Sequence, residues 1–153
     1  MIFIAHILND ILMMWKKDAV IDDVCLDDET LKSSKLHAKY LELFSMAKLM
    51  LKKKEMEYAS MKKDKWLYYN GKMSKDDMDK NKWKYDPFDG LSKPMKSDMD
   101  MYYSTDEDLV KIKAQIDYQK TIIETLEEIM GNIRWRHTHV KNILEFKKFT
   151  SGM

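Results

Sequence analysis

The chain has 153 residues, of which 44% are hydrophobic and 35% are charged, with a formal net charge of +1. Only four glycines, two prolines and one cysteine are present, which argues against a turn-rich sheet protein and excludes an internal disulfide. The length suits a single domain with a modest core, and the composition favours long helices. We therefore expect an all-α fold, with residues 1–153 forming one helical domain.

The first segment, "MIFIAHILNDILMMW", is apolar but is interrupted by Asp10 and is too short to span a bilayer. It has no basic stretch and no small-residue cleavage site, so it does not indicate a secretory signal. Its apolar residues recur at helical spacing, which predicts an amphipathic helix that packs on its own domain or on a neighbouring subunit, with no membrane partner. The expected apolar face consists of Ile4, Ile7, Leu8, Ile11 and Leu12.

Residues 28–69 contain neither glycine nor proline, which predicts one long helix or two closely spaced ones. Apolar residues recur there at steps of three and four and form a seam: Leu36, Tyr40, Leu43, Ala47 and Met50. Four lysines fall within one arc of the same helix and form a ridge: Lys48, Lys52, Lys62 and Lys63. Gly71 is a natural helix stop, so we expect the N-terminal helices to occupy residues 1–71.

The stretch "KKDKWLYYNGK" at 62–72 combines lysines with three aromatic rings. Lysine neutralises phosphate and an exposed ring stacks on a base, so the pairing indicates single-stranded nucleic acid. The candidate binding residues are Lys52, Lys62, Lys63, Lys65, Tyr68 and Tyr69. The alternative interpretation places the three lysines of the stretch on a solvated helix face and its aromatic side chains, Trp66 included, in the core.

Residues 72–103 hold both prolines and show no steady periodicity, which predicts a long loop. Ser104 and Glu107 form a capping box that opens a helical region over 104–150. Its coiled-coil-like seam predicts self-association, although an intramolecular hairpin with the first seam explains the same pattern. The candidate assembly residues are Ile112, Ile116, Ile123, Leu126, Met130, Ile133, Val140 and Leu144.

A second basic zone, "IRWRHTHVK" at 133–141, places Arg134 and Arg136 beside a tryptophan and is a second candidate patch for nucleic acid. Equally, cations near the end of a helix are favoured by its dipole. The two histidines of "HTH" lie two positions apart and would point to opposite sides of a helix, so they do not indicate a metal site. No glycine-rich phosphate loop is present. We expect no enzyme activity, no metal and no cofactor.

Several stretches together resemble one family, UvsY, the recombination mediators of tailed phages. "WKKDAVID" at 15–22 is similar to the family's entry segment, hydrophobic-K-K-D-hydrophobic-x-I-D, and "KDKWLYYNG" at 63–71 resembles its basic element K-A-R-L-D-Y-Y-S-G. Lys63 takes the place of the lysine in that element and Lys65 that of the arginine, with loss of bidentate geometry. Trp66 stands where the element has an apolar residue. The stretches "STDEDLVKIKAQIDYQ" and "IRWRHTHVKNILEFKKFTSG" follow the family's closing helices.

The resemblance implies a ring-shaped homo-oligomer of six or seven subunits, assembled through the C-terminal region, in the cytoplasm of the infected bacterial host. It also implies a function in homologous recombination, repair and DNA replication. The protein would bind single-stranded DNA and help load a RecA-like phage recombinase onto DNA coated by the phage single-strand-binding protein. The alternative is a coiled-coil adaptor or structural protein whose basic strip binds an acidic protein partner.

Overall fold

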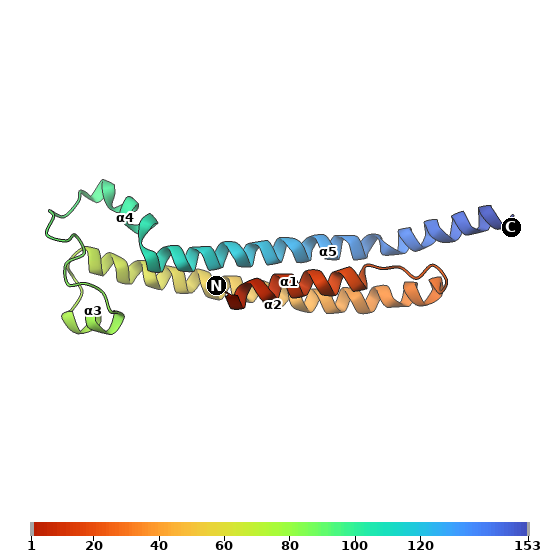
Figure 1. The fold of residues 1–153 in the computed structure, drawn as a ribbon, viewed down its shortest axis with the longest axis horizontal. Coiled ribbons are helices and arrows are strands. Elements are labelled where there is room, and N and C mark those ends of the chain that lie inside the picture. The colour runs from red at the N-terminus through yellow and green to blue at the C-terminus, as the bar shows by residue number, and fades with distance from the viewer. Residues whose placement is uncertain (1, 153) are drawn as a thin grey trace. The chain divides into compact units, whose positions relative to one another are not determined.

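The computed structural model describes residues 2–152, and side chains from residue 7 onward; the described residues form helices and no strand (Figure 1). The three long helices are α1 (Ile2–Asp18), α2 (Leu26–Tyr69) and α5 (Glu107–Ser151). The shorter elements are α3 (Lys75–Asn81), the 3₁₀ turn η1 (Lys96–Asp98) and α4 (Met99–Thr105). The prediction of an all-α fold is confirmed. No helix in the described part of the chain is both long and apolar enough to cross a membrane.

The chain divides into two compact units, which we call unit 1 and unit 2. Unit 1 consists of residues 1–49 and 120–153, so it contains α1, the first part of α2 and the second part of α5. Unit 2 consists of residues 50–119 and contains the end of α2, the elements α3, η1 and α4, and the start of α5. The two long helices α2 and α5 therefore contribute to both cores.

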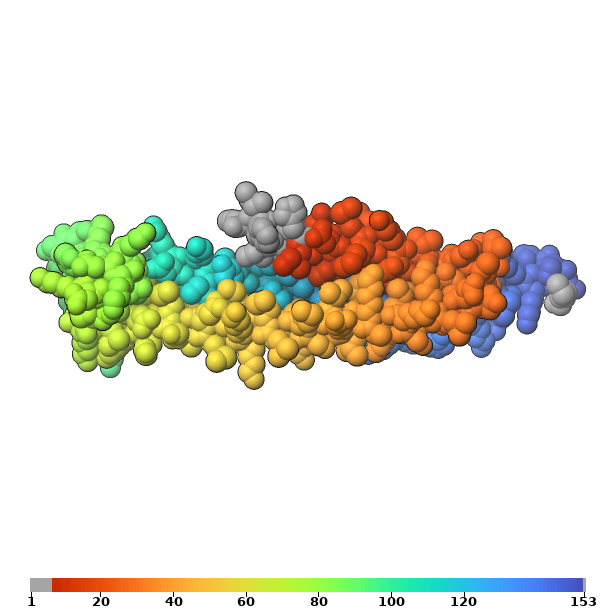
Figure 2. Space-filling view, turned by 90° about the horizontal axis from the view of Figure 1, so that it is seen from below, coloured from red at the N-terminus to blue at the C-terminus, as the bar shows by residue number. Residues whose placement is uncertain are grey.

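The core of unit 1 is built from the apolar seams of its helices. Its buried apolar side chains are Ile11, Leu36, Tyr40, Ala47, Ile122, Leu126, Ile129, Ile133 and Val140. Trp15 of α1 meets Tyr40 of α2 edge-on, with ring centroids 5.6 Å apart, and α1 lies against α2 in the space-filling view (Figure 2). Of the seam predicted for α2, Leu36, Tyr40 and Ala47 are buried and Leu43 is half-buried, whereas Met50 is 46% exposed.

The predicted apolar face of α1 is only partly buried. Ile11 is buried and Leu8 is half-buried, whereas Ile7 is 50% exposed and Leu12 is 40% exposed. The side chain of Ile4 lies outside the described residues. The contact surface of α1 within unit 1 is therefore narrower than the sequence pattern predicts.

The helix α2 runs without interruption and ends where the sequence predicts. Gly71 has a φ of 66°, a left-handed conformation that costs glycine little. Its N–H donates to the carbonyl of Tyr68, and the N–H of Lys72 donates to the carbonyl of Leu67. These two bonds form a Schellman motif, which satisfies the last carbonyls of the helix and turns the chain back.

The prediction of a loop over 72–103 is wrong for its two ends, which contain α3 and α4. The Ser74 hydroxyl caps α3 by accepting a hydrogen bond from the N–H of Asp77 at 3.1 Å, and Lys82, with a φ of 58°, ends it. Each helix has seven residues, about two turns, so no periodicity could become visible in the sequence. Their buried methionines, Met78 and Met99, pack onto the aromatic end of α2 and stabilise them.

The predicted capping box at Ser104 is also wrong. Ser104 and Thr105 close α4, and their hydroxyls donate to the carbonyl of Met101. Asp106 caps α5 instead, since its Oδ1 accepts from the N–H groups of Asp108 at 3.1 Å and Leu109 at 3.2 Å. A carboxylate is the stronger cap because it also interacts favourably with the positive end of the helix dipole.

Most residues that we expected to drive assembly are covered by their own chain. Ile116, Leu126, Ile133 and Val140 are buried, and Leu144 remains 42% exposed. The half-buried members of the set are Ile112, Ile123 and Met130. The intramolecular alternative accounts for the burial of this seam, and its part in self-association stays a prediction.

Candidate nucleic-acid interface

The eight side chains predicted to bind nucleic acid fall into two groups by their exposure. Four are exposed: Lys52, Lys62, Lys63 and Arg134. The other four are buried, with exposed fractions of 4% for Lys65, 7% for Tyr68, 9% for Tyr69 and 1% for Arg136. Direct binding requires exposure, so the structure contradicts the binding interpretation for the second group. Tyr68 and Tyr69 lie in the core, as the alternative interpretation expects, whereas that interpretation is wrong for Lys65, which is buried, and for Trp66, which is 43% exposed.

Lys65 is neutralised inside unit 2 by two carboxylates. Its Nζ lies 2.9 Å from Oδ2 of Asp106 and 2.8 Å from Oδ2 of Asp108. The ammonium also lies 3.9 Å from the centroid of the Trp83 ring, and the indole N–H of Trp83 donates to Asp108 at 2.9 Å. The hydrogen bond from Lys65 holds the pKa of Asp108 below its usual range, although burial acts in the opposite direction. A lysine held in this way has no free charge for a phosphate.

Tyr68 and Tyr69 are the centre of an aromatic cluster rather than a stacking surface. Tyr69 packs against Phe88 and Tyr102, and its hydroxyl donates to Asp106 at 2.8 Å. Burial, followed by the hydrogen bond to Asp106, raises the pKa of Tyr69 well above its usual value. The short elements of unit 2 need apolar surface to fold against, and these two rings supply it.

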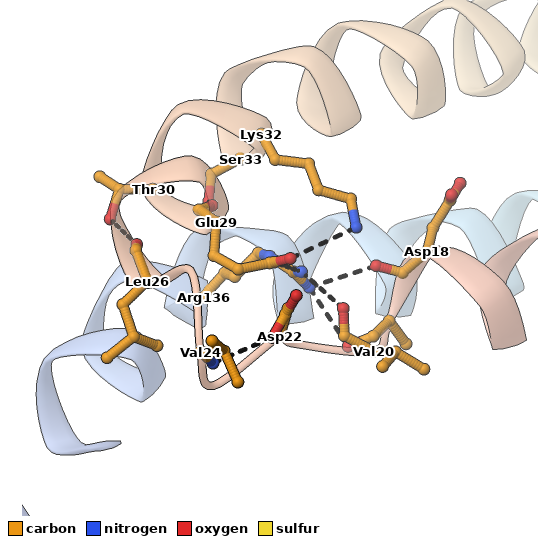
Figure 3. A network of polar contacts seen from close by, with 11 residues as sticks. Asp18, Val20, Asp22, Val24, Leu26, Glu29, Thr30, Lys32, Ser33 and Arg136 are labelled. Atoms are coloured by element: carbon orange, nitrogen blue, oxygen red, sulfur yellow. Dashed lines mark hydrogen bonds and ion pairs between the residues drawn. The ribbon is translucent and has the colours of Figure 1, made fainter. Parts of the chain in front are cut away.

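Arg136 is buried in unit 1 and closes the C-terminal end of α1 (Figure 3). Its guanidinium pairs with the Glu29 carboxylate and donates to the carbonyls of Asp18 at 3.3 Å, Ala19 at 3.2 Å and Val20 at 2.9 Å. Burial raises the pKa of Glu29, but the hydrogen bond and charge of Arg136 outweigh it, and the pKa lies below its usual value. Arg136 is therefore a structural residue.

Three exposed lysines of α2 have no carboxylate partner among the described residues: Lys52, Lys62 and Lys63. Lys52 and Lys63 make no ion pair within the described part of the chain, and the Lys62 ammonium lies 5.9 Å from the centroid of the Tyr103 ring. Eleven residues are close to three helical turns, so Lys52 and Lys63 share one side of the helix about 16 Å apart. This spacing suits successive contacts along a flexible polyanion.

Arg134 is exposed in unit 1, but its surroundings are mixed. It lines a hollow together with His37, Phe44, Glu127 and Glu128, so two acidic residues share its surroundings. The neighbouring Trp135 is 64% exposed. Acidic neighbours weaken the attraction for a phosphate, and Arg134 is a weaker candidate than the lysines of α2.

Two side chains at the end of α2 were not selected from the sequence as binding residues. Trp66 is 43% exposed, unlike the buried tyrosines beside it, and the Lys72 ammonium lies 4.6 Å from the centroid of its ring. Both lie in the stretch at 62–72 that combines lysines with aromatic rings, and the left-handed turn at Gly71 reverses the chain and brings Lys72 back toward Trp66. No group of three metal-binding side chains occurs among the described residues.

A helical chain with exposed, unpaired lysines along one long helix fits the class of helical proteins that bind nucleic acid. The model of the family described as "Recombination, repair and ssDNA binding protein UvsY" matches residues 14–153. The chain therefore belongs to the UvsY family of recombination, repair and single-stranded-DNA-binding proteins.

Individual relatives agree with this assignment. The recombination protein uvsY of Enterobacteria phage T4 is 23% identical over 145 residues, which cover 95% of this chain and 98% of that protein. A crystal structure of the phage T4 recombination mediator protein UvsY matches with a TM-score of 0.78, at 23% identity, and covers 94% of this chain and 96% of that one. Another crystal form matches with a TM-score of 0.77, also at 23% identity, and covers 92% and 98%. The resemblance seen in the sequence is confirmed, and so is the helical fold.

Proposed function

We propose that this protein is a recombination mediator. It binds single-stranded DNA and helps a RecA-like phage recombinase assemble on DNA that is covered by the phage single-strand-binding protein, in the cytoplasm of the infected host. The observation that carries this proposal is the match of residues 14–153 to the UvsY family. The crystallised T4 relative is described as a recombination mediator protein and has the same fold.

The DNA contacts of the proposed mediator centre on α2. Lys52, Lys62 and Lys63 are exposed and have no carboxylate partner in the described chain, so each can replace a counterion on a phosphate. Arg134 provides a second, weaker contact in unit 1. Lys65, Tyr68, Tyr69 and Arg136 act indirectly, because they hold the elements that position these cations.

Self-association completes the proposal. The last turns of α5 carry three exposed apolar side chains, with exposed fractions of 42% for Leu144, 67% for Phe146 and 83% for Phe149. Burying them between copies would remove apolar surface from water, and a ring of six or seven subunits is the expected form. Repeating a weak site around such a ring raises overall affinity by roughly 10²- to 10⁴-fold.

A titration of labelled single-stranded DNA across a series of salt concentrations tests the DNA contact. For Lys62→Ala/Lys63→Ala we expect weaker binding and a salt slope that is smaller by about 1.4, or roughly 0.7 for each lost phosphate contact on a single strand. The matched control is Lys16→Ala/Lys17→Ala, which removes two exposed lysines from α1. An unchanged salt slope for Lys62→Ala/Lys63→Ala would show that Lys62 and Lys63 do not contact the DNA phosphates.

The mediator role is tested with the partners present. Recombinase is added to single-stranded DNA that is already covered by single-strand-binding protein, and its DNA-dependent ATP hydrolysis is followed. We expect this protein to restore the ATP hydrolysis that the bound single-strand-binding protein suppresses. If the protein binds DNA yet restores nothing, the mediator role is refuted. If it shows no gel shift with single-stranded DNA at moderate salt, the adaptor alternative replaces it.

A further inference from the structure

Trp66 is an exposed aromatic side chain in the last turn of α2. In "KDKWLYYNG" it stands between the buried Lys65 and the buried tyrosines, yet it is 43% exposed. The UvsY element has an aliphatic residue at this position, so the indole ring is a property of this chain. An exposed indole offers a flat face to which any base can stack.

The ring borders a cleft of about 560 Å³ that lies entirely within unit 2. Three parts of the unit form its walls. The last turns of α2 contribute Trp66 and Asn70, and the other lining residues are Lys93, Pro94, Lys96, Met99, Asp100 and Tyr103. A volume of several hundred cubic ångströms is in the range of pockets that hold small organic groups, and it leaves ample room for one nucleobase.

The charge around the cleft is mainly positive. The Lys72 ammonium lies 4.6 Å from the centroid of the Trp66 ring, where the Schellman turn at Gly71 places it. Lys93 donates to Oδ1 of Asn70 at 2.9 Å, and Lys96 is exposed in the lining. Asp100 is the single carboxylate of the lining. Three ammonium groups and one carboxylate around a flat ring favour an anionic ligand that carries an aromatic group.

We propose that this cleft holds one unpaired base of single-stranded DNA, stacked on Trp66, while Lys72, Lys93 and Lys96 contact the phosphates on either side. The proposal rests on the proposed function, because it assigns a further contact of the same single strand. An acidic peptide would use the lysines but would not need the indole ring beside them. The combination of ring and cations therefore favours nucleic acid.

The decisive experiment compares two short labelled oligonucleotides of equal length, one of thymidines and one abasic, by fluorescence anisotropy. Both carry the same phosphates, so the difference between their affinities measures the contribution of the bases. For Trp66→Ala we expect affinity for the thymidine strand to fall by roughly 5- to 150-fold, with the affinity for the abasic strand and both salt slopes unchanged. Trp66→Phe retains an aromatic ring, so it should keep most of the difference in affinity between the thymidine strand and the abasic strand.

Two controls separate stacking from other effects. Tyr85→Ala removes a ring that is 59% exposed in the same unit but does not line the cleft, and it should behave like the native protein. Lys93→Gln/Lys96→Gln should weaken the binding of both strands equally and lower both salt slopes by about 1.4.

The outcomes distinguish this inference from the proposed function. If the native protein binds the thymidine strand and Trp66→Ala keeps its preference for that strand over the abasic one, the base cleft is refuted and the DNA-binding function stands. Equal loss on both strands with Trp66→Ala refutes it as well, since that result indicates a structural role. If the native protein binds neither strand, both the proposed DNA-binding function and the proposed base-binding role of the cleft are refuted.

Discussion

The ammonium group of Lys65 lies 2.9 Å from the carboxylate of Asp106, and both side chains are buried in unit 2. Asp106 also caps α5 and accepts a hydrogen bond from the hydroxyl of Tyr69. One carboxylate thus joins the last turns of α2 to the first turn of α5. Lys65, which the sequence indicates as a DNA-binding residue, is therefore part of the internal packing of unit 2.

Replacing Lys65 with alanine should therefore destabilise the fold. The change leaves the Asp106 carboxylate buried without its cation, and breaking a buried ion pair from one side costs about 3–5 kcal/mol. The free energy of unfolding, measured by urea denaturation, should fall by that amount. Lys63→Ala, at an exposed position two residues earlier, should stay within about 0.5 kcal/mol of the native protein. Equal stability of the two variants would contradict the internal role of Lys65.

The hydroxyls of Tyr69 and Tyr103 offer a matched pair of substitutions. Tyr69→Phe removes a hydrogen bond to a charged group and should lower the free energy of unfolding by about 1.5–3 kcal/mol. The hydroxyl of Tyr103 is buried and has no partner among the described residues, so Tyr103→Phe should leave that free energy unchanged or raise it by about 1 kcal/mol. Thermal and urea unfolding check both values, and a loss at Tyr103 as large as that at Tyr69 would show that its hydroxyl does have a partner.

Acid should weaken unit 1 through Glu29. The pKa of Glu29 in the folded chain lies below its ordinary value of 4.5, so the unfolded state binds a proton first as the pH falls. The stabilisation from the Arg136 pair is therefore complete above pH 4.5 and is lost as the pH drops through the lower, folded pKa. Glu29→Gln should be less stable at pH 7 by about 1–3 kcal/mol, and its difference from the native protein should shrink below pH 4.5. A difference that stays constant down to pH 2 would refute this coupling.

The exposed end of α5 should control self-association. Phe146→Ser/Phe149→Ser removes two large apolar side chains from the surface, so folding of the single chain should be unaffected. We expect a smaller mass in analytical ultracentrifugation and weaker binding of long single-stranded DNA. Leu126→Asp would be a poor test, because Leu126 is fully buried and its replacement disrupts the core of unit 1. An unchanged mass for the double variant would place the assembly surface elsewhere.

Sequence periodicity was sufficient to predict the long helices but not the short ones. The steps of three and four along α2 and α5, and the glycine that ends α2, predicted these helices because such patterns extend over many turns. The elements α3 and α4 have seven residues each, and they depend on contacts with the aromatic cluster at Tyr68 and Tyr69 rather than on local pattern.

Local sequence also predicts only part of the candidate site. Lys62 and Lys63 are exposed as expected, but nothing near Lys65 in the sequence indicates that Asp106 and Asp108 will neutralise it. The burial of Arg136 is even harder to predict from the sequence, since the Glu29 that pairs with it is 107 residues away. Charge and aromatic content mark a stretch as suitable for nucleic acid, whereas tertiary partners decide which of its side chains remain free.

The contacts of Arg136 with the end of α1 involve carbonyl oxygens of Asp18, Ala19 and Val20, and no side chain of those residues (Figure 3). Every amino acid brings a carbonyl, so these contacts do not depend on the side chains of Ala19 and Val20, provided that Arg136 and Glu29 are kept. Asp18 differs, because its carboxylate pairs with Lys39 at 2.6 Å and accepts a hydrogen bond from the Tyr40 hydroxyl at 3.0 Å. The path of the chain after α1 is therefore held by backbone carbonyls at Ala19 and Val20, and by a side chain as well as a carbonyl at Asp18. Comparisons based on the identity of residues 19 and 20 would miss the contacts that hold this path in three dimensions.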